Sequence, residues 1–170
     1  MSGSILVIDN FYENPHPFHM GFHKEECLIT DETVGKISQI VGNPVEVLSA
    51  SNEKTSYPSV VAHLASDWIA IINTSFPLQS FGEFGVSFYS HLETGLETFP
   101  SQQDMAKYQI NDSNIAEKFN TNRQLWKQYG QIPAKYNRLV LFRSNLWHSY
   151  TPKEEINTSI FYQKLILKNV

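Results

Sequence analysis

One segment near the start of the chain carries apolar residues at helical spacing. Residues 31–41 open with two acidic side chains and place Val34, Ile37 and Val41 on one face. Gly42 follows directly, and glycine is common just after the last turn of a helix. The pattern predicts a helix of about three turns, with these three apolar side chains turned toward the rest of the protein.

Short β-branched or aromatic runs, separated by polar residues, glycine and proline, dominate the remainder of the chain. Such runs are typical of strands. We expect strands at residues 5–8, 45–51, 59–65, 67–76, 86–92, 138–144 and 158–167. Gly82 and Gly85 precede one of these runs and suggest a turn or a close backbone approach. Residues 101–129 are polar and poor in β-branched types, which indicates an irregular or partly helical insertion. The pattern predicts a mainly β (α+β) fold.

Composition favours one folded domain over residues 1–170, because hydrophobic residues make up 41% of the chain and charged residues 18%. The aromatic share of 13% also favours strands. A net charge of −4 argues against nucleic acid as a partner, since phosphate contact requires basic surfaces.

The single cysteine, Cys27, excludes an intramolecular disulfide framework and any cysteine-based metal cage within one chain. No apolar stretch approaches the roughly 20 residues of a membrane helix, and the first residues lack the pattern of a signal peptide. We therefore expect a soluble, cytoplasmic protein with no membrane partner. The pattern leaves the oligomeric state open.

Histidines are the main candidates for chemistry, because the chain has no Gly-x-Ser-x-Gly elbow and no glycine-rich phosphate loop. His16, His19 and His23 are three and four residues apart, a spacing that would place them on one face of a helix and allow metal binding. Pro17 interrupts that helix, so a solvated loop is the simpler interpretation.

His63 and His148 differ from the others, because each lies at the end of a β-like run. A jelly-roll barrel can place a metal at its mouth with two histidines from separate strands. Non-haem iron takes two imidazoles and one carboxylate, and the carboxylate nearest to His63 in the sequence is Asp67. Taken alone, a histidine in such a position is more often an ordinary structural residue than a metal ligand.

Three blocks of the chain resemble a known superfamily: VIDNFYENP at residues 7–15, GVSFYSHLETGLE at 85–97 and YNRLVLFRSNLWHSYTP at 136–152. They are similar, in order, to small prolyl-4-hydroxylase-like bacterial proteins of the iron(II)- and 2-oxoglutarate-dependent oxygenase superfamily. The resemblance implies a double-stranded β-helix (jelly roll) with one or two flanking helices. It also implies a hydroxylase-like oxygenase that uses Fe(II) and 2-oxoglutarate on a small-molecule, amino-acid or peptide substrate.

Carried over by this resemblance, His148 matches the distal iron ligand and His63 the proximal one, but Ala65 stands where the family has a carboxylate. Three alternatives follow. Asp67 reaches the metal instead; the position stays open, which resembles the halogenases of this superfamily that bind chloride there; or the metal site is lost. In the last case the chain is a non-catalytic binding or structural module.

The cosubstrate position also departs from the family. Its members hold the distal carboxylate of 2-oxoglutarate with an Arg or Lys near the start of the last core strand. Here Asn157 stands near that position, and Arg143 and Lys164 are the available bases at other positions. Ser90 replaces a further basic residue of the family's central block.

Two more residues are candidates for the substrate pocket. His91 lies in the block at 85–97, either as a pocket residue or as a buried turn residue that closes the loop through Glu93 and Thr94. Trp68 is expected to be core or pocket wall, given the area that an indole buries.

Overall fold

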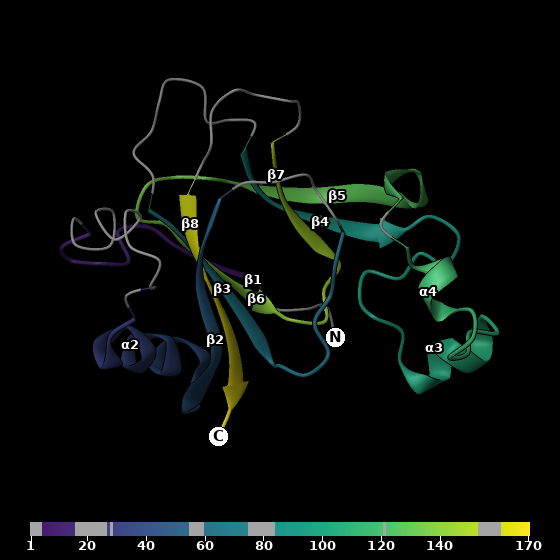
Figure 1. Cartoon of the computed structure of the whole chain (residues 1–170), viewed down its shortest axis with the longest axis horizontal. Coiled ribbons are helices and arrows are strands. Elements are labelled where there is room, and N and C mark those ends of the chain that lie inside the picture. Colours follow the sequence, from purple (N-terminus) through teal and green to yellow (C-terminus); the bar gives the residue numbers. More distant parts are fainter. Residues whose placement is uncertain are drawn as a thin grey trace.

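The computed structural model of the chain contains two antiparallel β-sheets and a few helices (Figure 1). It describes residues 5–15, 27, 29–54, 60–74, 84–120, 122–152 and 161–170. The larger sheet contains, in spatial order, β1 (Ile5–Ile8), β6 (Leu139–Arg143), β3 (Trp68–Asn73), β8 (Phe161–Asn169) and β2 (Val45–Lys54). The smaller sheet contains β5 (Trp126–Pro133), β4 (Phe84–His91) and β7 (His148–Pro152). The predicted β-rich fold is confirmed.

Helix α2 (Asp31–Val41) has the bounds that the sequence predicts. Thr30 caps its start, because the Thr33 amide donates to Thr30 Oγ1 at 3.2 Å. At the other end Gly42 takes a left-handed φ of 77°, and its amide donates to the Ser38 carbonyl at 3.0 Å.

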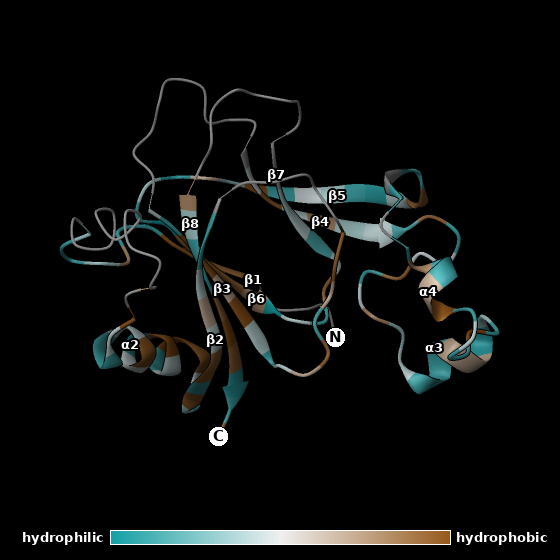
Figure 2. Cartoon of the chain, in the orientation of Figure 1, coloured by the Kyte–Doolittle hydropathy of each residue, from teal (hydrophilic) through white to brown (hydrophobic). Residues whose placement is uncertain are grey.

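The outer face of the larger sheet packs against α2 (Figure 1). This outer cluster contains the buried residues Phe11, Tyr12, Ile37, Val45, Trp68, Ala70, Ile72, Leu139, Leu141, Leu165 and Leu167. Ile37 is fully buried, and Val34 and Val41 pack against the cluster, so the predicted inward face of the helix is confirmed. Figure 2 shows that β3 and β6 are mostly hydrophobic, whereas hydrophobic and hydrophilic residues alternate along α2.

A second apolar layer lies between the two sheets. This inter-sheet cluster contains Ile69, Ile71, Val86, Phe88, Val140, Phe142, Leu146 and Tyr162. Successive side chains of a strand point to opposite faces, and β3 follows the rule: Trp68, Ala70 and Ile72 belong to the outer cluster and the two residues between them to the inter-sheet cluster. Both faces of β3 are therefore buried.

The structure differs from the strand predictions at three places: one predicted strand does not form, and two strands were not predicted. Residues 60–67 do not form a strand, and Val61 makes only an isolated bridge to His148. The stretch 126–133, expected inside the insertion, is β5; as an edge strand with mostly exposed or half-exposed side chains it carries no clear apolar alternation. Strand β7 is likewise too short and polar to stand out in the sequence.

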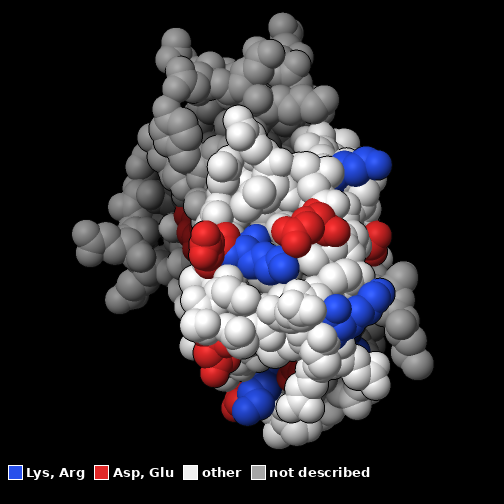
Figure 3. Space-filling view, turned by 90° about the vertical axis from the view of Figure 1, so that its right-hand side faces the viewer, with Lys and Arg blue, Asp and Glu red and all other residues white. Residues whose placement is uncertain are grey.

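The insertion itself is partly helical, as predicted. It contains α3 (Gln102–Lys107), α4 (Ile115–Lys118) and η3 (Arg123–Leu125). Across the described ranges, no helix combines the length and apolar character needed to cross a membrane. On the face drawn in Figure 3, acidic and basic side chains are interspersed.

Gly85 explains how β4 and β5 approach each other. A Cβ atom at this position would lie 2.0 Å from the Ile132 carbonyl oxygen, so any other residue would push the strands apart. The predicted close backbone approach is confirmed here, whereas Gly82 lies outside the described residues.

Ile37→Ala tests the packing of α2. We expect the free energy of unfolding to fall by about 2–4 kcal/mol, because the change leaves a cavity in a fully buried position. Urea denaturation measures the loss, and Gln39→Ala, an exposed site on the same helix, is the control. Equal effects of the two substitutions would contradict this account of the helix.

Candidate metal centre

His148 begins β7 and turns its ring into the space between the sheets. The ring is buried, and its centroid lies 4.8 Å from that of Phe142 in an edge-on contact. Nδ1 lies 2.8 Å from the Leu146 carbonyl oxygen, an acceptor, so this nitrogen carries the proton and Nε2 presents a lone pair. Burial lowers the pKa of His148 to about 3, although the hydrogen bond to the Leu146 carbonyl opposes the shift; the charge of Lys164 acts in the same direction as burial. The imidazole is therefore neutral at neutral pH, as a metal ligand must be.

The main chain brings His63 to the same place. Val61 and His148 exchange two backbone hydrogen bonds, of 2.9 and 3.0 Å, and the His63 amide donates to the Ser144 carbonyl at 2.7 Å. These bonds hold the segment 60–63 against the start of β7. The centroids of the two imidazole rings lie 5.8 Å apart, with 28° between their planes.

The His63 ring carries a buried nitrogen, Nε2, that has no hydrogen-bond partner among the residues that the structure describes. Burial lowers the pKa of His63, as does the charge of Lys164, so this imidazole also favours its neutral form. An unsatisfied buried nitrogen costs free energy unless a ligand or metal meets it. Two rings that share one metal have centroids at most about 6.6 Å apart, given a bond of about 2.1 Å to each ring nitrogen. The observed separation fits this limit.

Lys164 and Glu53 lie on the same inner face of the larger sheet. Lys164 is two residues beyond Tyr162, a member of the inter-sheet cluster, and the register of β2 and β8 pairs Glu53 with Tyr162 and Ser51 with Lys164. Lys164 Nζ lies 3.9 Å from Glu53 Oε1, and both side chains are largely buried, with 19% and 34% exposed. The sheet thus directs one cation and one anion toward the histidines.

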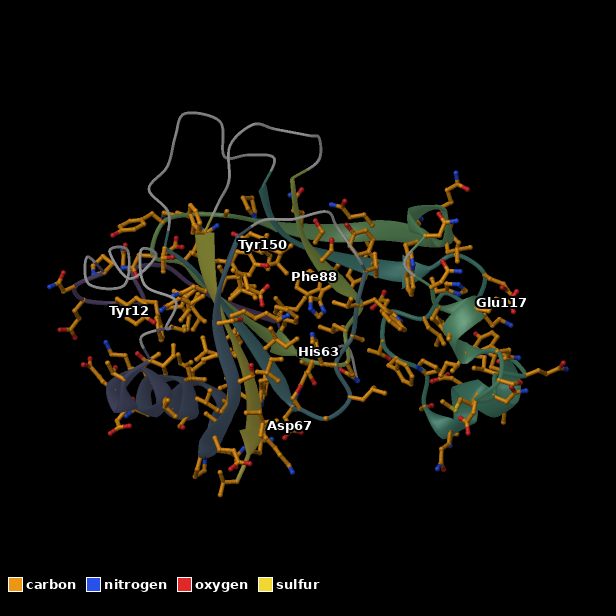
Figure 4. The ribbon with its side chains drawn as sticks, viewed as in Figure 1. Tyr12, His63, Asp67, Phe88, Glu117 and Tyr150 are labelled. Atoms are coloured by element: carbon orange, nitrogen blue, oxygen red, sulfur yellow. The ribbon has the colours of Figure 1, made fainter. Side chains whose placement is uncertain are left out.

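Two tyrosines pack against each other across the two sheets. The ring centroids of Tyr150 and Tyr162 lie 3.9 Å apart, and each joins a different sheet. The Tyr162 hydroxyl donates to Glu53 Oε2 at 2.9 Å. The buried Tyr150 hydroxyl has no hydrogen-bond partner within the described part of the chain. Burial raises the pKa of Tyr150, so its phenol stays protonated. In Figure 4, Tyr150, Phe88 and His63 lie one below another between the sheets.

The structure does not bring Asp67 to the histidine pair. Its carboxylate accepts a hydrogen bond from the Asn169 amide at 2.9 Å, and its own amide donates to the Leu167 carbonyl at 2.9 Å. Figure 4 shows Asp67 well below His63. Within the described part of the chain, no three His, Cys, Asp or Glu side chains gather closely enough to hold a metal ion.

Arg143 and Trp68 lie on the opposite face of the larger sheet. Trp68 belongs to the outer cluster, and the Arg143 guanidinium lies 3.9 Å from the centroid of the indole. Strand alternation explains the placement, because Leu139 and Leu141 of β6 also face outward while Phe142 faces the other sheet. Neither side chain faces the histidines.

His91 packs in a separate aromatic cluster. It is 1% exposed, and its ring centroid lies 4.7 Å from that of Phe119 and 5.2 Å from that of Trp126. Nδ1 lies 3.1 Å from Thr94 Oγ1. These contacts match the alternative in which His91 closes its turn, and Glu93 pairs instead with Lys118 at 3.2 Å.

Sequence reasoning missed Glu53, Tyr150 and Tyr162. A signal for one of them was present, since Tyr162 and Lys164 stand two residues apart in a strand-like run and so share a face. Asn157, His16, His19 and His23 lie outside the described residues.

Comparison with known proteins adds information on the fold. A model of a family of unknown function (DUF6445) matches residues 78–159. No curated protein sequence matches the chain. Crystal structures of HygX from Streptomyces hygroscopicus share the fold. The iron-bound form has a TM-score of 0.57 at 10% identity, covering 99% of this chain and 83% of HygX. The form with nickel and 2-oxoglutarate has a TM-score of 0.56 at 9% identity, covering 99% of this chain and 84% of HygX.

His91→Ala tests the structural role of this residue. We expect a loss of about 2 kcal/mol in the free energy of unfolding, because a buried ring and its hydrogen bond are removed. Chemical denaturation gives the value, and Leu92→Ala, at an exposed neighbouring position, is the control. Metal affinity, measured by calorimetry on the folded variant, should stay at the wild-type value; a large drop would place His91 in the site after all.

Proposed function

We propose that this protein is a non-haem iron(II)- and 2-oxoglutarate-dependent oxygenase with a double-stranded β-helix core. The observation that carries the proposal is the pair of neutral imidazoles, with ring centroids 5.8 Å apart, on the inner side of the sheet that also presents Lys164. One of the two rings has a buried Nε2 without a partner among the described residues. HygX structures with iron, or with nickel and 2-oxoglutarate, on a shared fold support it.

The residues divide into two roles in this proposal. His63 and His148 would hold the metal through their Nε2 atoms, and Lys164 would bind the distal carboxylate of the oxo acid. Bound iron and 2-oxoglutarate would supply the activation of dioxygen and the oxidation of the substrate. Tyr150 and Tyr162, which pack against each other, would limit the access of water to the site. The substrate would be a small molecule, an amino acid or a peptide.

The donor set lacks a third protein ligand, whereas iron sites of this type take two imidazoles and one carboxylate. Ala65 offers no donor, and the Asp67 carboxylate is bound to the Asn169 amide. Asp67 can act as the third ligand only if its carboxylate gives up the hydrogen bond from the Asn169 amide. Otherwise an external anion such as chloride completes the metal's coordination, as the halogenase alternative requires.

A non-catalytic binding module is the second candidate, and the Asp67 contact favours it. The carboxylate helps to fix the end of β8 through Asn169, which is a structural task. In this case the inter-sheet space would bind a small ligand without metal chemistry.

Metal titration tests the histidine pair. We expect the wild-type protein to bind ferrous iron in anaerobic calorimetry, and His63→Ala and His148→Ala each to weaken binding by more than about 100-fold, since each removes a direct ligand. Leu64→Ala, at an exposed neighbouring position, is the control. Absence of iron binding by the wild-type protein at millimolar concentration, with or without 2-oxoglutarate and chloride, would leave the non-catalytic module.

The same titration identifies the third ligand. If Asp67 coordinates, Asp67→Ala abolishes binding and Asp67→Glu keeps part of it. If chloride coordinates, affinity rises with chloride concentration and is insensitive to either substitution.

A second titration tests Lys164. On manganese-loaded protein we expect Lys164→Ala to weaken 2-oxoglutarate binding by about 10- to 100-fold, because a charge-assisted hydrogen bond is lost. Lys168→Ala, at an exposed position on the same strand, and Arg143→Ala, on the outer face, should leave affinity unchanged. A loss with Arg143→Ala alone would assign the anchor to that residue instead.

A further inference from the structure

Residues 101–120, the α3–α4 segment, are attached to the two sheets through side chains. Among the described residues, the backbone hydrogen bonds of this segment stay within it, such as those from Met105 to Ser101 and from Phe119 to Ile115. The segment lies beside the end of β4 and the start of β5 (Figure 1). A segment without a backbone ladder to its neighbours can open as a local unit. Side-chain contacts therefore decide how firmly it is closed.

His91 lies where the α3–α4 segment meets the smaller sheet. Its buried ring contacts Phe119, at the end of α4, and Trp126, at the start of β5, with centroid distances of 4.7 and 5.2 Å. Nδ1 lies 3.1 Å from Thr94 Oγ1, and a backbone hydrogen bond links the ring to Lys118. One imidazole thus joins the end of β4, the turn that follows it, α4 and β5.

Two polar contacts support the same attachment. Lys118 Nζ lies 3.2 Å from Glu93 Oε1, in the turn after β4, and donates to the Tyr108 carbonyl at 3.3 Å. Trp126 Nε1 donates to the Asn120 carbonyl at 2.9 Å. Both contacts lie at the surface or its edge, whereas the imidazole is the buried polar group of the junction.

A proton on His91 opposes this packing. Burial lowers the pKa of His91, and the charge of Lys118 acts in the same direction, whereas the charge of Glu93 and the backbone hydrogen bond raise it. Within the described part of the chain these are the two charges that act on the ring, since Phe119 and Trp126 carry none. An exposed histidine has a pKa of about 6.5. Proton uptake therefore favours the opened segment: the closed state is fully stabilised above about pH 6.5 and loses stability as the pH falls below it.

We propose that His91 is an acid-sensitive latch: the neutral ring holds the α3–α4 segment on the end of the smaller sheet, and the protonated ring favours its opening. Opening would separate Phe119 from Trp126 and Trp147, whose ring centroids lie 6.2 and 5.5 Å from its own. Trp147 directly precedes His148, so the latch borders the candidate metal centre. The inference does not depend on the proposed function, because it involves neither a metal nor an oxo acid.

Amide hydrogen exchange on the full chain tests the latch. The hydrogen-bonded amides of Met105, Tyr108 and Phe119 report on the segment. After correction for intrinsic rates, their protection should fall between about pH 6.5 and pH 5 by up to about tenfold per pH unit, the limit for one proton. Amides of β3 and β6 should stay more strongly protected at every pH. Asp104, which caps α3, stays ionised in this range, because hydrogen bonds from Ser101 lower its pKa.

Two variants separate the proton from the contacts. His91→Gln keeps a side chain that can hydrogen-bond but has no proton to gain in this range, so it should remove the pH dependence of protection in the segment. Lys118→Gln removes the ion pair with Glu93 and keeps the titrating ring. It should lower protection by about fivefold at most at every pH and preserve the pH dependence. Circular dichroism checks that each variant is folded.

The outcomes are distinct. Protection of the segment that does not change with pH in the wild-type protein, or a pH dependence that persists in His91→Gln, would overturn the latch. If His91→Gln does not fold, titration of the wild-type ring by NMR decides the question. A pKa of His91 below that of an exposed histidine supports the latch, and an equal or higher value overturns it.

Discussion

Burial of both faces of β3 and β6 is the constraint on which the rest of the structure depends. Alternate side chains of these strands enter the outer cluster against α2 and the inter-sheet cluster against β4. An unpaired polar group is disfavoured on either face of β3 and β6, because the free-energy cost of removing it from water would exceed the gain from packing. The candidate metal ligands lie at the end of the inter-sheet layer, where Val61 pairs with His148. The inner face of the paired strands β2 and β8 presents Glu53 and Lys164.

The polar groups at this end are held mainly by the backbone and by strand register. The paired amides of Val61 and His148 set the spacing of the two imidazoles, and the Leu146 carbonyl selects the tautomer of the second. The β2–β8 register, in turn, places Glu53 and Lys164 beside each other. Main-chain pairing therefore carries much of the geometry of this site.

Local periodicity was sufficient for much of the fold. The helix at 31–41 follows from apolar spacing and a glycine stop, and its capping and packing depend on residues within or next to the segment. Strands β3 and β6 follow from continuous apolar runs, since a strand that is buried on both faces is apolar at nearly every position. For the site, the resemblance of the late block singled out His148, and the order of the blocks singled out His63.

Tertiary structure alone decided which polar residues share the site. Asp67 is close to His63 in sequence, yet its carboxylate binds Asn169, a residue 102 positions away. Glu53 and Lys164 are distant in sequence and meet because β2 pairs with β8. Arg143 lies on the outward-facing side of β6, against Trp68. Edge strands such as β5 also escaped prediction, because their exposed side chains need no apolar pattern. A one-residue change of register would exchange the two faces of a strand, and register is set by long-range pairing that local sequence does not encode.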